Sequence, residues 1–276
     1  MDGIDNTYTY NGDYYRRRSE NDVKAGLIVA SAASAIIMSM LPSFSNPFAK
    51  QIRKEHANSH LYKDAFFKSV ENSGLKSKGL AVIDTKFKDV AEQQLYKSGE
   101  KIIDGDIKAG LNACYVPQNR IIKLNVDKAA ISGFHELGHA MNNLKSRLGN
   151  ILQKCRVPGY TLSGLMGMIA LTTRPKPKEA KRNAEDVILD NCGLIAFSGM
   201  LPTVAEEALA SRNGIKMAKQ AGLNENLVKN IKKIYGKALL SYAGYAVLTG
   251  LSVFAAGEIM QLFTRPQKIN REEIYY

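Results

Sequence analysis

The sequence predicts a mainly α-helical, multi-pass membrane protein with a small β element. Four uncharged apolar runs lie along the 276 residues, Lys and Arg flank these runs, and the motif HELGH follows a short β-branched segment. A helix needs about 20 apolar residues to cross a membrane. Runs of this length therefore indicate membrane helices, or alternatively the buried core helices of a soluble protein.

The N-terminal part is predicted to be a flexible tail followed by a membrane anchor. Residues 1–24 contain TYTYNGDYYRRRSEND, a polar stretch without a helical period. The run at 25–49 is long enough to span a membrane. It does not read as a cleavable signal, because 24 residues precede it and Pro42 and Pro47 lie where a small-residue cleavage site would be expected. We therefore expect an anchor there.

Residues 50–156 are predicted to form the region that carries the chemistry. The segment from Arg120 to Asn125 alternates in polarity and is β-branched, which predicts a short strand directly before the HELGH helix. We expect an edge strand that can pair with an extended peptide. The alternative is an ordinary edge strand that has no ligand.

The motif FHELGHAMNN places two of the chain's four His residues four positions apart. On an α-helix, His135 and His139 then lie one above the other, and two imidazoles can converge on one metal ion. Glu136 follows them round the helix, near enough to handle a proton of metal-activated water. The alternative is a coincidental spacing of partly buried His on an amphipathic helix.

The remaining chain is predicted to consist of an apolar hairpin, a polar helix and a final membrane helix. Residues 157–205 form the hairpin, with RPKPKEAKRNAED at its turn, and 238–264 form the C-terminal membrane helix before a tail at 265–276. Residues 206–237 supply a helix and a basic linker. Two crossings between the motif and residue 206 would return the chain to the same side of the membrane.

The formal net charge is +12, but Lys and Arg border the apolar runs instead of forming one stripe with aromatic residues. This distribution favours a lipid bilayer as partner over nucleic acid. The three Cys residues form no CxxC pair, which argues against a disulfide framework and a thiolate zinc site. As thiols, Cys114 and Cys155 favour the cytosolic face for the catalytic side.

A catalytic zinc site needs three protein ligands and one open position. No His follows His139, so the third ligand should be a carboxylate. The candidates are Glu179, Glu185, Asp186, Glu206 and Glu207. The last two open the stretch EEALASRNGIKMA after an apolar run, where a carboxylate is ordinarily a helix-dipole partner. The missing ligand favours one of this pair.

The order of apolar anchor, strand, HELGHA, apolar pair, EALASR and final apolar run resembles the bacterial membrane-embedded neutral zinc metallopeptidases. These gluzincins are related to the HtpX-like and CAAX-prenyl-processing peptidases. The resemblance covers residues from about 110 to 260, with HELGH and EALASR as its specific parts. It implies a zincin-like HExxH helix, the zinc ligands His135, His139 and Glu207, and Glu136 as general base.

The chain departs from the HtpX-like branch at one position. That branch has an Asp four residues after the Glu ligand, and this chain has Ser211. A hydroxyl would then replace the carboxylate that orients a ligating His. The neutral peptidase branch shares the Ser. Glu206 is expected to be a first-turn carboxylate, and Ala210 and Ser211 would let this helix approach the HELGH helix closely.

The expected function is that of a membrane zinc endopeptidase that uses Zn²⁺ and acts on peptides or membrane proteins. Arg212, Tyr235 and Tyr242 are candidates for a second donor to the oxyanion. Two alternatives remain on the sequence: a soluble zinc peptidase with apolar core helices, and a non-catalytic metal-binding membrane scaffold.

Overall fold

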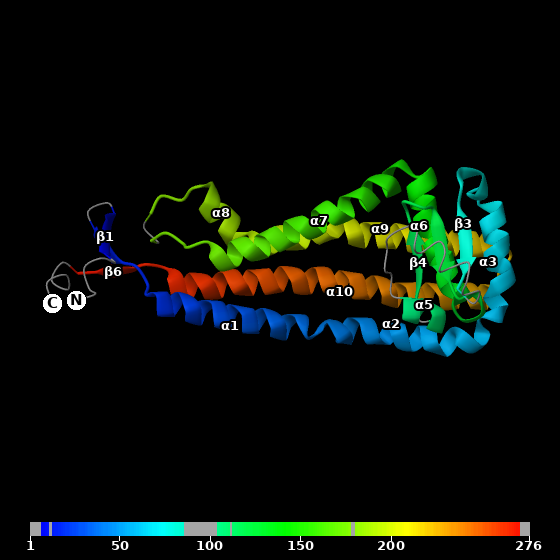
Figure 1. Ribbon diagram of the computed structural model, residues 1–276, viewed down its shortest axis with the longest axis horizontal. Coiled ribbons are helices and arrows are strands. Elements are labelled where there is room, and N and C mark those ends of the chain that lie inside the picture. Colours follow the sequence, from blue (N-terminus) through cyan, green and yellow to red (C-terminus); the bar gives the residue numbers. More distant parts are fainter. Residues whose placement is uncertain (1–6, 11–12, 86–103, 111, 178–179, 271–276) are drawn as a thin grey trace. The chain divides into compact units, whose positions relative to one another are not determined.

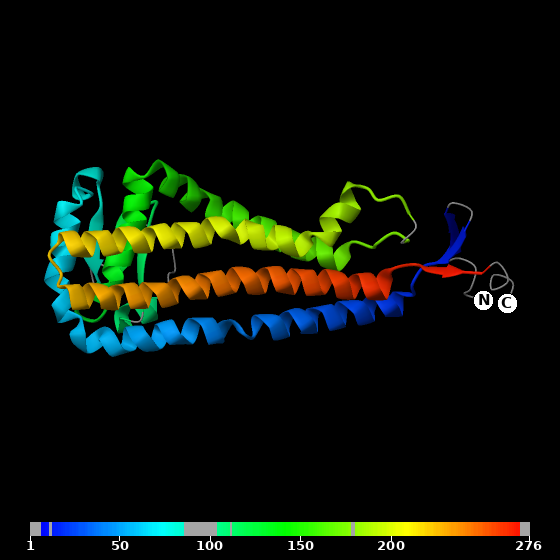
Figure 2. The same cartoon turned by 180° about the vertical axis from the view of Figure 1, so that it is seen from behind.

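Helices make up most of the computed structural model, which describes residues 7–10, 13–85, 104–110, 112–177 and 180–270 (Figures 1 and 2). The mainly α-helical class with a small β element is confirmed. The helices are α1 (Glu20–Met38), α2 (Leu41–Glu55), α3 (His60–Asn72), α5 (Asp104–Ala109), α6 (Val126–Lys145), α7 (Arg147–Thr172), α8 (Ala184–Asp190), α9 (Cys192–Gln220) and α10 (Glu225–Thr264).

Three helical stretches are long and apolar enough to cross a membrane. They are Glu20–Asn58, which contains α1 and α2, and the helices α9 and α10. The middle runs of the sequence differ in this respect. The run near 191–205 belongs to α9. Helix α7, which contains residues 157–172 of the preceding run, is not among these three stretches although it has 26 residues.

The chain divides into two units. The first comprises residues 1–41, 157–201 and 245–276, and the second comprises residues 42–156 and 202–244. The second unit contains the HELGH motif, both Glu206 and Glu207, and the first part of α10 up to residue 244.

In the first unit, α1 lies beside the C-terminal part of α10 in both views (Figures 1 and 2). A Cβ atom on Gly26 would lie 2.8 Å from the Phe263 Cβ, so glycine is needed for this approach. Ser34 Oγ donates to the Ser252 carbonyl at 3.2 Å. The parts of α7 and α9 in this unit also pack together, because Ser163 Oγ donates to the Ala196 carbonyl at 2.7 Å.

Strands form where the sequence predicted tails. The strands β1 (Thr7–Tyr10), β2 (Asp13–Arg16) and β6 (Gln267–Ile269) make an antiparallel sheet in the order β1-β2-β6. The prediction of flexible tails at 1–24 and 265–276 is therefore wrong for these residues. The remaining tail residues, 1–6, 11–12 and 271–276, lie outside the described part of the chain.

The second unit contains a sheet in the order β3 (Ala81–Asp84), β5 (Ile121–Leu124) and β4 (Ala113–Val116). The predicted strand before the HELGH helix is β5, but it is not an edge strand. It pairs in parallel with β3 and antiparallel with β4, which places it in the centre. Within the described residues, β3 and β4 are the edge strands of this sheet, and α6 packs on β4 and β5.

Helix α6 packs against this sheet on one side and against α3 on another (Figure 1). Phe134 on α6 makes an edge-to-face contact with Phe66 on α3, with ring centroids 5.8 Å apart. Such aromatic pairs stabilise a fold beyond what the burial of their apolar area contributes. The core around them also contains Tyr62, Leu124, Ile131 and Leu137.

The first turn of α6 is kinked at Ala129, whose backbone is non-helical (φ −126°, ψ 23°). Ser59 compensates for the kink, because its Oγ accepts from the Ala130 amide at 3.1 Å and donates to the Val126 carbonyl at 3.0 Å. The buried polar groups of the kink are thus satisfied. The HELGH residues follow in the regular part of the helix.

Candidate metal centre

The two His residues of the motif converge on one point beside α6. His135 Nε2 lies 3.1 Å from His139 Nε2, and their ring centroids are 4.6 Å apart. This is the consequence of a four-residue spacing on a helix, which stacks the two side chains on one face.

Glu207, on α9, completes a triangle of donor atoms. Its Oε2 lies 3.0 Å from His135 Nε2 and 3.5 Å from His139 Nε2. Two ligands at about 2.05 Å from a tetrahedral zinc ion lie about 3.3 Å apart. All three edges of the triangle are close to this length. Two imidazole nitrogens and one carboxylate oxygen are also a donor set that catalytic zinc sites use.

The carboxylates beside the triangle extend the cluster. His135, Glu136 and His139 bring potential ligand atoms within 4.8 Å of one another, and so do His139, Glu206 and Glu207. The residues present therefore fit a metal ion. Zinc in particular is part of the function proposed below.

Glu206 has a different place from the one expected. It is not in a first turn, because α9 already begins at Cys192, and its side chain is fully buried. Its Oε1 lies 2.9 Å from His139 Nδ1 and also accepts from Asn142 Nδ2 at 2.9 Å. A carboxylate that holds the second ring nitrogen fixes the orientation of a ligating His. Glu206 is therefore a positioning residue for His139.

Ser211 lies where the sequence placed a hydroxyl partner for a His. Its Oγ is 3.2 Å from Nδ1 of His135. The two imidazoles are thus oriented by different groups, His135 by a hydroxyl and His139 by a carboxylate.

Arg156 is a site residue that the sequence analysis did not find. Its guanidinium lies 3.1 Å from Glu206 Oε2 and 3.1 Å from Glu207 Oε1. This cation offsets the repulsion between two adjacent buried carboxylates. The residue directly precedes the uncharged run at 157–173. Because Lys and Arg flank the other apolar runs as well, the sequence alone does not distinguish Arg156 from them.

The α6 and α9 helices approach each other closely at Gly138. A Cβ atom there would overlap the backbone carbonyl of Ala210, and one on Gly214 would overlap the carbonyl of Phe134. The close approach expected from the small residues after Glu207 is present. It brings Glu207 and Ser211 within reach of the two His residues.

We expect Gly138→Ala to lower the stability of the chain and its capacity to bind a metal ion, because the new methyl group meets the backbone of α9. Overpacking of this kind costs about 1–3 kcal/mol or more. Thermal unfolding and metal-binding measurements in detergent would detect both effects. The matched control is Gly236→Ala on α10, where nothing lies within 4 Å, and it should be neutral or stabilising by about 0.5–1 kcal/mol. Equal melting temperatures for the two variants would contradict the described packing.

Glu136 is buried, with 8% of its surface exposed, and a carboxylate oxygen lies within 4.8 Å of a ring nitrogen of each of the two His residues. Burial raises the pKa of its carboxyl group, the two His residues oppose this rise, and Glu207 adds to it. The backbone of Tyr115 on β4 lies within hydrogen-bonding reach of the same carboxylate. Glu136 thus lies near both the candidate ligands and the edge strand β4.

His139 is also buried, which acts to lower the pKa of its imidazole. Hydrogen bonds to Glu206 and Glu207 outweigh this effect and raise the pKa to about 10 in the metal-free chain. A metal ion would have to displace this proton, as is usual for metal sites built from His and carboxylates.

The three candidates for an oxyanion donor have different surroundings in the structure. Tyr242 lies within hydrogen-bonding reach of Glu207. Tyr235 packs on the His135 ring at a centroid distance of 5.2 Å, but its hydroxyl donates to the Ile131 carbonyl at 2.6 Å. Arg212 is exposed. Of the three, Tyr242 has its hydroxyl at the cluster.

Glu185 and Asp186, which were also considered as ligands, do not belong to this cluster. Glu185 and Asp186 lie in α8 of the first unit, and Asp186 caps that helix by accepting from the Asn183 amide at 2.8 Å. Glu179 lies outside the described residues.

Comparison of the chain with protein-family models, with curated proteins and with solved structures finds no match. The functional assignment therefore rests on the geometry of the cluster and on the resemblance of HELGH and EALASR.

Proposed function

We propose that this chain is a zinc-dependent endopeptidase of membranes. The observation that carries the proposal is the triangle formed by His135 Nε2, His139 Nε2 and Glu207 Oε2, with edges of 3.0 to 3.5 Å. Glu136 lies beside this triangle without being one of its corners. The combination of three ligands and an adjacent carboxylate is the arrangement that metal-assisted hydrolysis needs.

A bound zinc ion would lower the pKa of a coordinated water toward about 7 and polarise the scissile carbonyl. The chain's own residues perform the other tasks. His135, His139 and Glu207 hold the ion, and Glu206 and Ser211 fix the two imidazoles. Glu136 accepts the proton of the attacking water and delivers it to the leaving amine. Its raised pKa suits a group that both accepts and donates a proton.

Peptide substrates are expected to bind along β4. The sequence predicts this role for the strand before the HELGH helix, but that strand is β5, whose two edges are both paired. Among the described strands, β4 pairs only with β5, so its outer edge can add an extended peptide. The Tyr115 backbone at Glu136 places that edge beside the proposed general base.

The membrane part of the proposal is supported by apolar side chains that face outward in the first unit. Examples are Ile28 on α1, Val157 on α7, Leu194 on α9 and Leu262 on α10, each with 63% to 73% of its surface exposed. Large exposed apolar surfaces mark contact with a membrane or another protein. With three membrane-length helices, a bilayer is the partner that explains them best. The cytosolic face remains the proposed side for catalysis.

Removal and return of the metal tests the proposed function. The purified chain in detergent should contain about one zinc per chain and should cleave casein or a membrane-protein substrate. A chelator should abolish cleavage, and zinc should restore it, because the three ligands form the only proposed route to activated water. Cleavage that persists after the zinc has been removed would exclude this mechanism.

A further inference from the structure

A cationic cleft lies in the second unit where β4 and α6 both end. It consists of two adjoining cavities of about 630 and 590 Å³ that share Lys78, Asn143, Leu144 and Asn150. Four cations are among the residues that line it: Lys78, Arg120, Lys145 and Arg147. We call these two cavities together the cationic cleft.

The charge of the cationic cleft is not balanced within the described part of the chain. No Asp or Glu is among its described lining residues, and none of its four cations forms an ion pair there. Three of the cations are held in place by backbone carbonyls. Lys78 Nζ donates to Leu144 O at 3.1 Å, Arg120 Nη1 donates to Lys78 O at 2.8 Å, and Lys145 Nζ donates to Ser73 O. An anionic ligand would find preorganised positive charge in this cleft.

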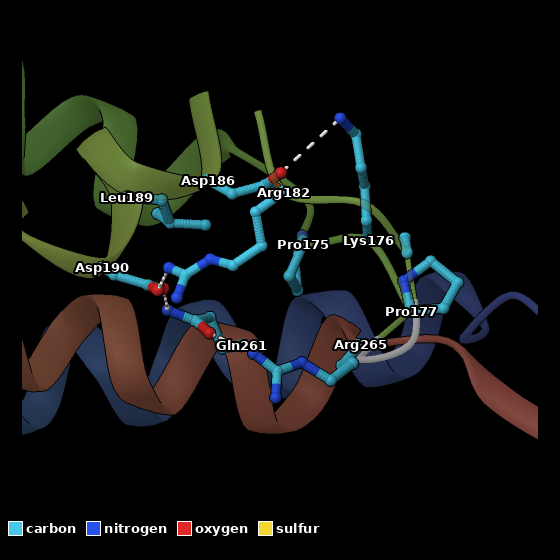
Figure 3. A pocket seen from close by; sticks show the side chains of 10 residues that line it. Pro175, Lys176, Pro177, Arg182, Asp186, Leu189, Asp190, Gln261 and Arg265 are labelled. Atoms are coloured by element: carbon cyan, nitrogen blue, oxygen red, sulfur yellow. Dashed lines mark hydrogen bonds and ion pairs between the residues drawn. The ribbon is translucent and has the colours of Figure 1, made fainter. Parts of the chain in front are cut away.

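The first unit offers a useful contrast. Its cleft, of about 350 Å³, is also lined by Lys and Arg (Figure 3). There, however, Lys176 forms an ion pair with Asp186 and Arg182 forms one with Asp190. In that cleft the chain itself supplies the anions, whereas the described lining of the cationic cleft contains none.

The position of the cationic cleft relative to Glu136 follows from α6. Asn143 comes seven residues after Glu136, so it lies on the same helix face and about 10 Å further along the axis. Tyr115 connects the two points, because its backbone reaches Glu136 and its hydroxyl donates to Asn143 Oδ1 at 3.1 Å. The part of α6 that lines the cationic cleft therefore begins about 10 Å along the helix from Glu136.

The end of β4 lies beside the same cleft. Pro117 and Gln118 line the cationic cleft and belong to the turn that follows β4, which ends at Val116. An extended peptide advances about 3.3 Å per residue, so about three residues would cover the roughly 10 Å that separate Glu136 from Asn143 along α6.

We propose that the cationic cleft recognises an acidic side chain of the peptide substrate, about three residues from the scissile bond and on one side of it. This inference rests on the proposed peptidase function and names a substrate class for it. A membrane surface carries the same negative charge. The position of the cleft next to the end of β4, about 10 Å along α6 from Glu136, favours a peptide.

The test is a scan of peptides with the zinc-loaded full chain in detergent. A neutral, internally quenched peptide receives a single Glu, or a Gln as its neutral counterpart, at each position on both sides of the scissile bond. At one position about three residues from the bond, Glu should raise kcat/KM about fivefold over Gln, the scale of one or two exposed ion pairs. Every other position should show a ratio near one.

Two charge-reversal variants test whether the preference for Glu over Gln originates in the cationic cleft. Arg147→Glu, in the cationic cleft, should abolish the Glu preference while cleavage of the neutral peptide continues. Arg53→Glu is the matched control, because Arg53 is an exposed cation of α2 outside the cleft lining. It should leave the preference intact. Binding of the Glu and Gln peptides to the Glu136→Gln protein, measured by fluorescence anisotropy, should show the same ratio without any turnover.

The outcomes separate this inference from the proposed function. Zinc-dependent cleavage with no Glu preference at any position would overturn the inference and leave the proposed function in place. Absence of cleavage of every peptide would overturn both. If Arg147→Glu lost binding to anionic vesicles and kept the peptide preference, the cationic cleft would be a lipid-binding surface and the inference would be wrong.

Discussion

The Glu136→Gln protein should bind about one zinc per chain and cleave substrate at least about 10²-fold more slowly than the unchanged protein. The carboxylate is outside the triangle of His135, His139 and Glu207, so its replacement by an amide of the same size leaves the three ligands in place. The amide cannot accept the proton of the attacking water. The chemical step therefore loses its base while the metal centre remains.

This result is checked by zinc analysis and by cleavage rates on the same preparations. A suitable control is Glu185→Gln, which makes the same chemical change at an exposed position of α8. It should leave both quantities unchanged. Equal activity of the Glu136→Gln and unchanged proteins would refute the role of Glu136 as general base. Loss of zinc from the Glu136→Gln protein would indicate that Glu136 is itself a ligand.

The local elements of the second unit could be predicted from the sequence because their signals are local. The β-branched alternation before the motif predicted β5, and the four-residue spacing of His135 and His139 predicted their convergence on α6. The place of β5 in the sheet could not be predicted in this way. Its parallel partner β3 lies about 40 residues earlier in the chain, and parallel pairing leaves no mark in either strand alone.

The terminal strands illustrate the same limit. The residues of β1 and β2 are rich in Tyr and Thr, which favour strands, but a polar tail without a third strand would gain little from pairing. The third strand, β6, comes from the other end of the chain and pairs with β2. Such a contact becomes visible only when the whole fold is known.

The supporting residues of the metal centre were hidden for a related reason. Glu206 follows an apolar run, and a charge at that point suggested the start of a new helix. In the structure, α9 continues from Cys192 through this position, so Glu206 is buried in mid-helix. Arg156 and Asn142, which contact it, come from α7 and α6. A sequence shows the charges of such a network but not that three helices bring them together.

The two adjacent carboxylates should respond differently to substitution, and this difference tests the whole arrangement. Glu207→Ala removes the only carboxylate oxygen of the triangle, so the variant should lose its bound zinc. In the Glu206→Gln variant, the amide oxygen can still accept hydrogen bonds from His139 and Arg156. These bonds are weaker than those of the carboxylate, which is charged. Outer partners of ligating His residues typically contribute 10- to 100-fold to metal affinity. We therefore expect the Glu206→Gln protein to bind one zinc about 10- to 100-fold more weakly.

Competition with chelators of graded strength would measure this affinity, and zinc analysis after gel filtration would measure retention. The unfolding temperature of both variants serves as a control, since a chain that fails to fold also loses its metal. If a folded Glu206→Gln protein lost zinc completely while Glu207→Ala retained it, the ligand assignment would be off by one residue. Because neighbouring side chains on a helix point about 100° apart, α9 would then have to be rotated by that angle about its axis.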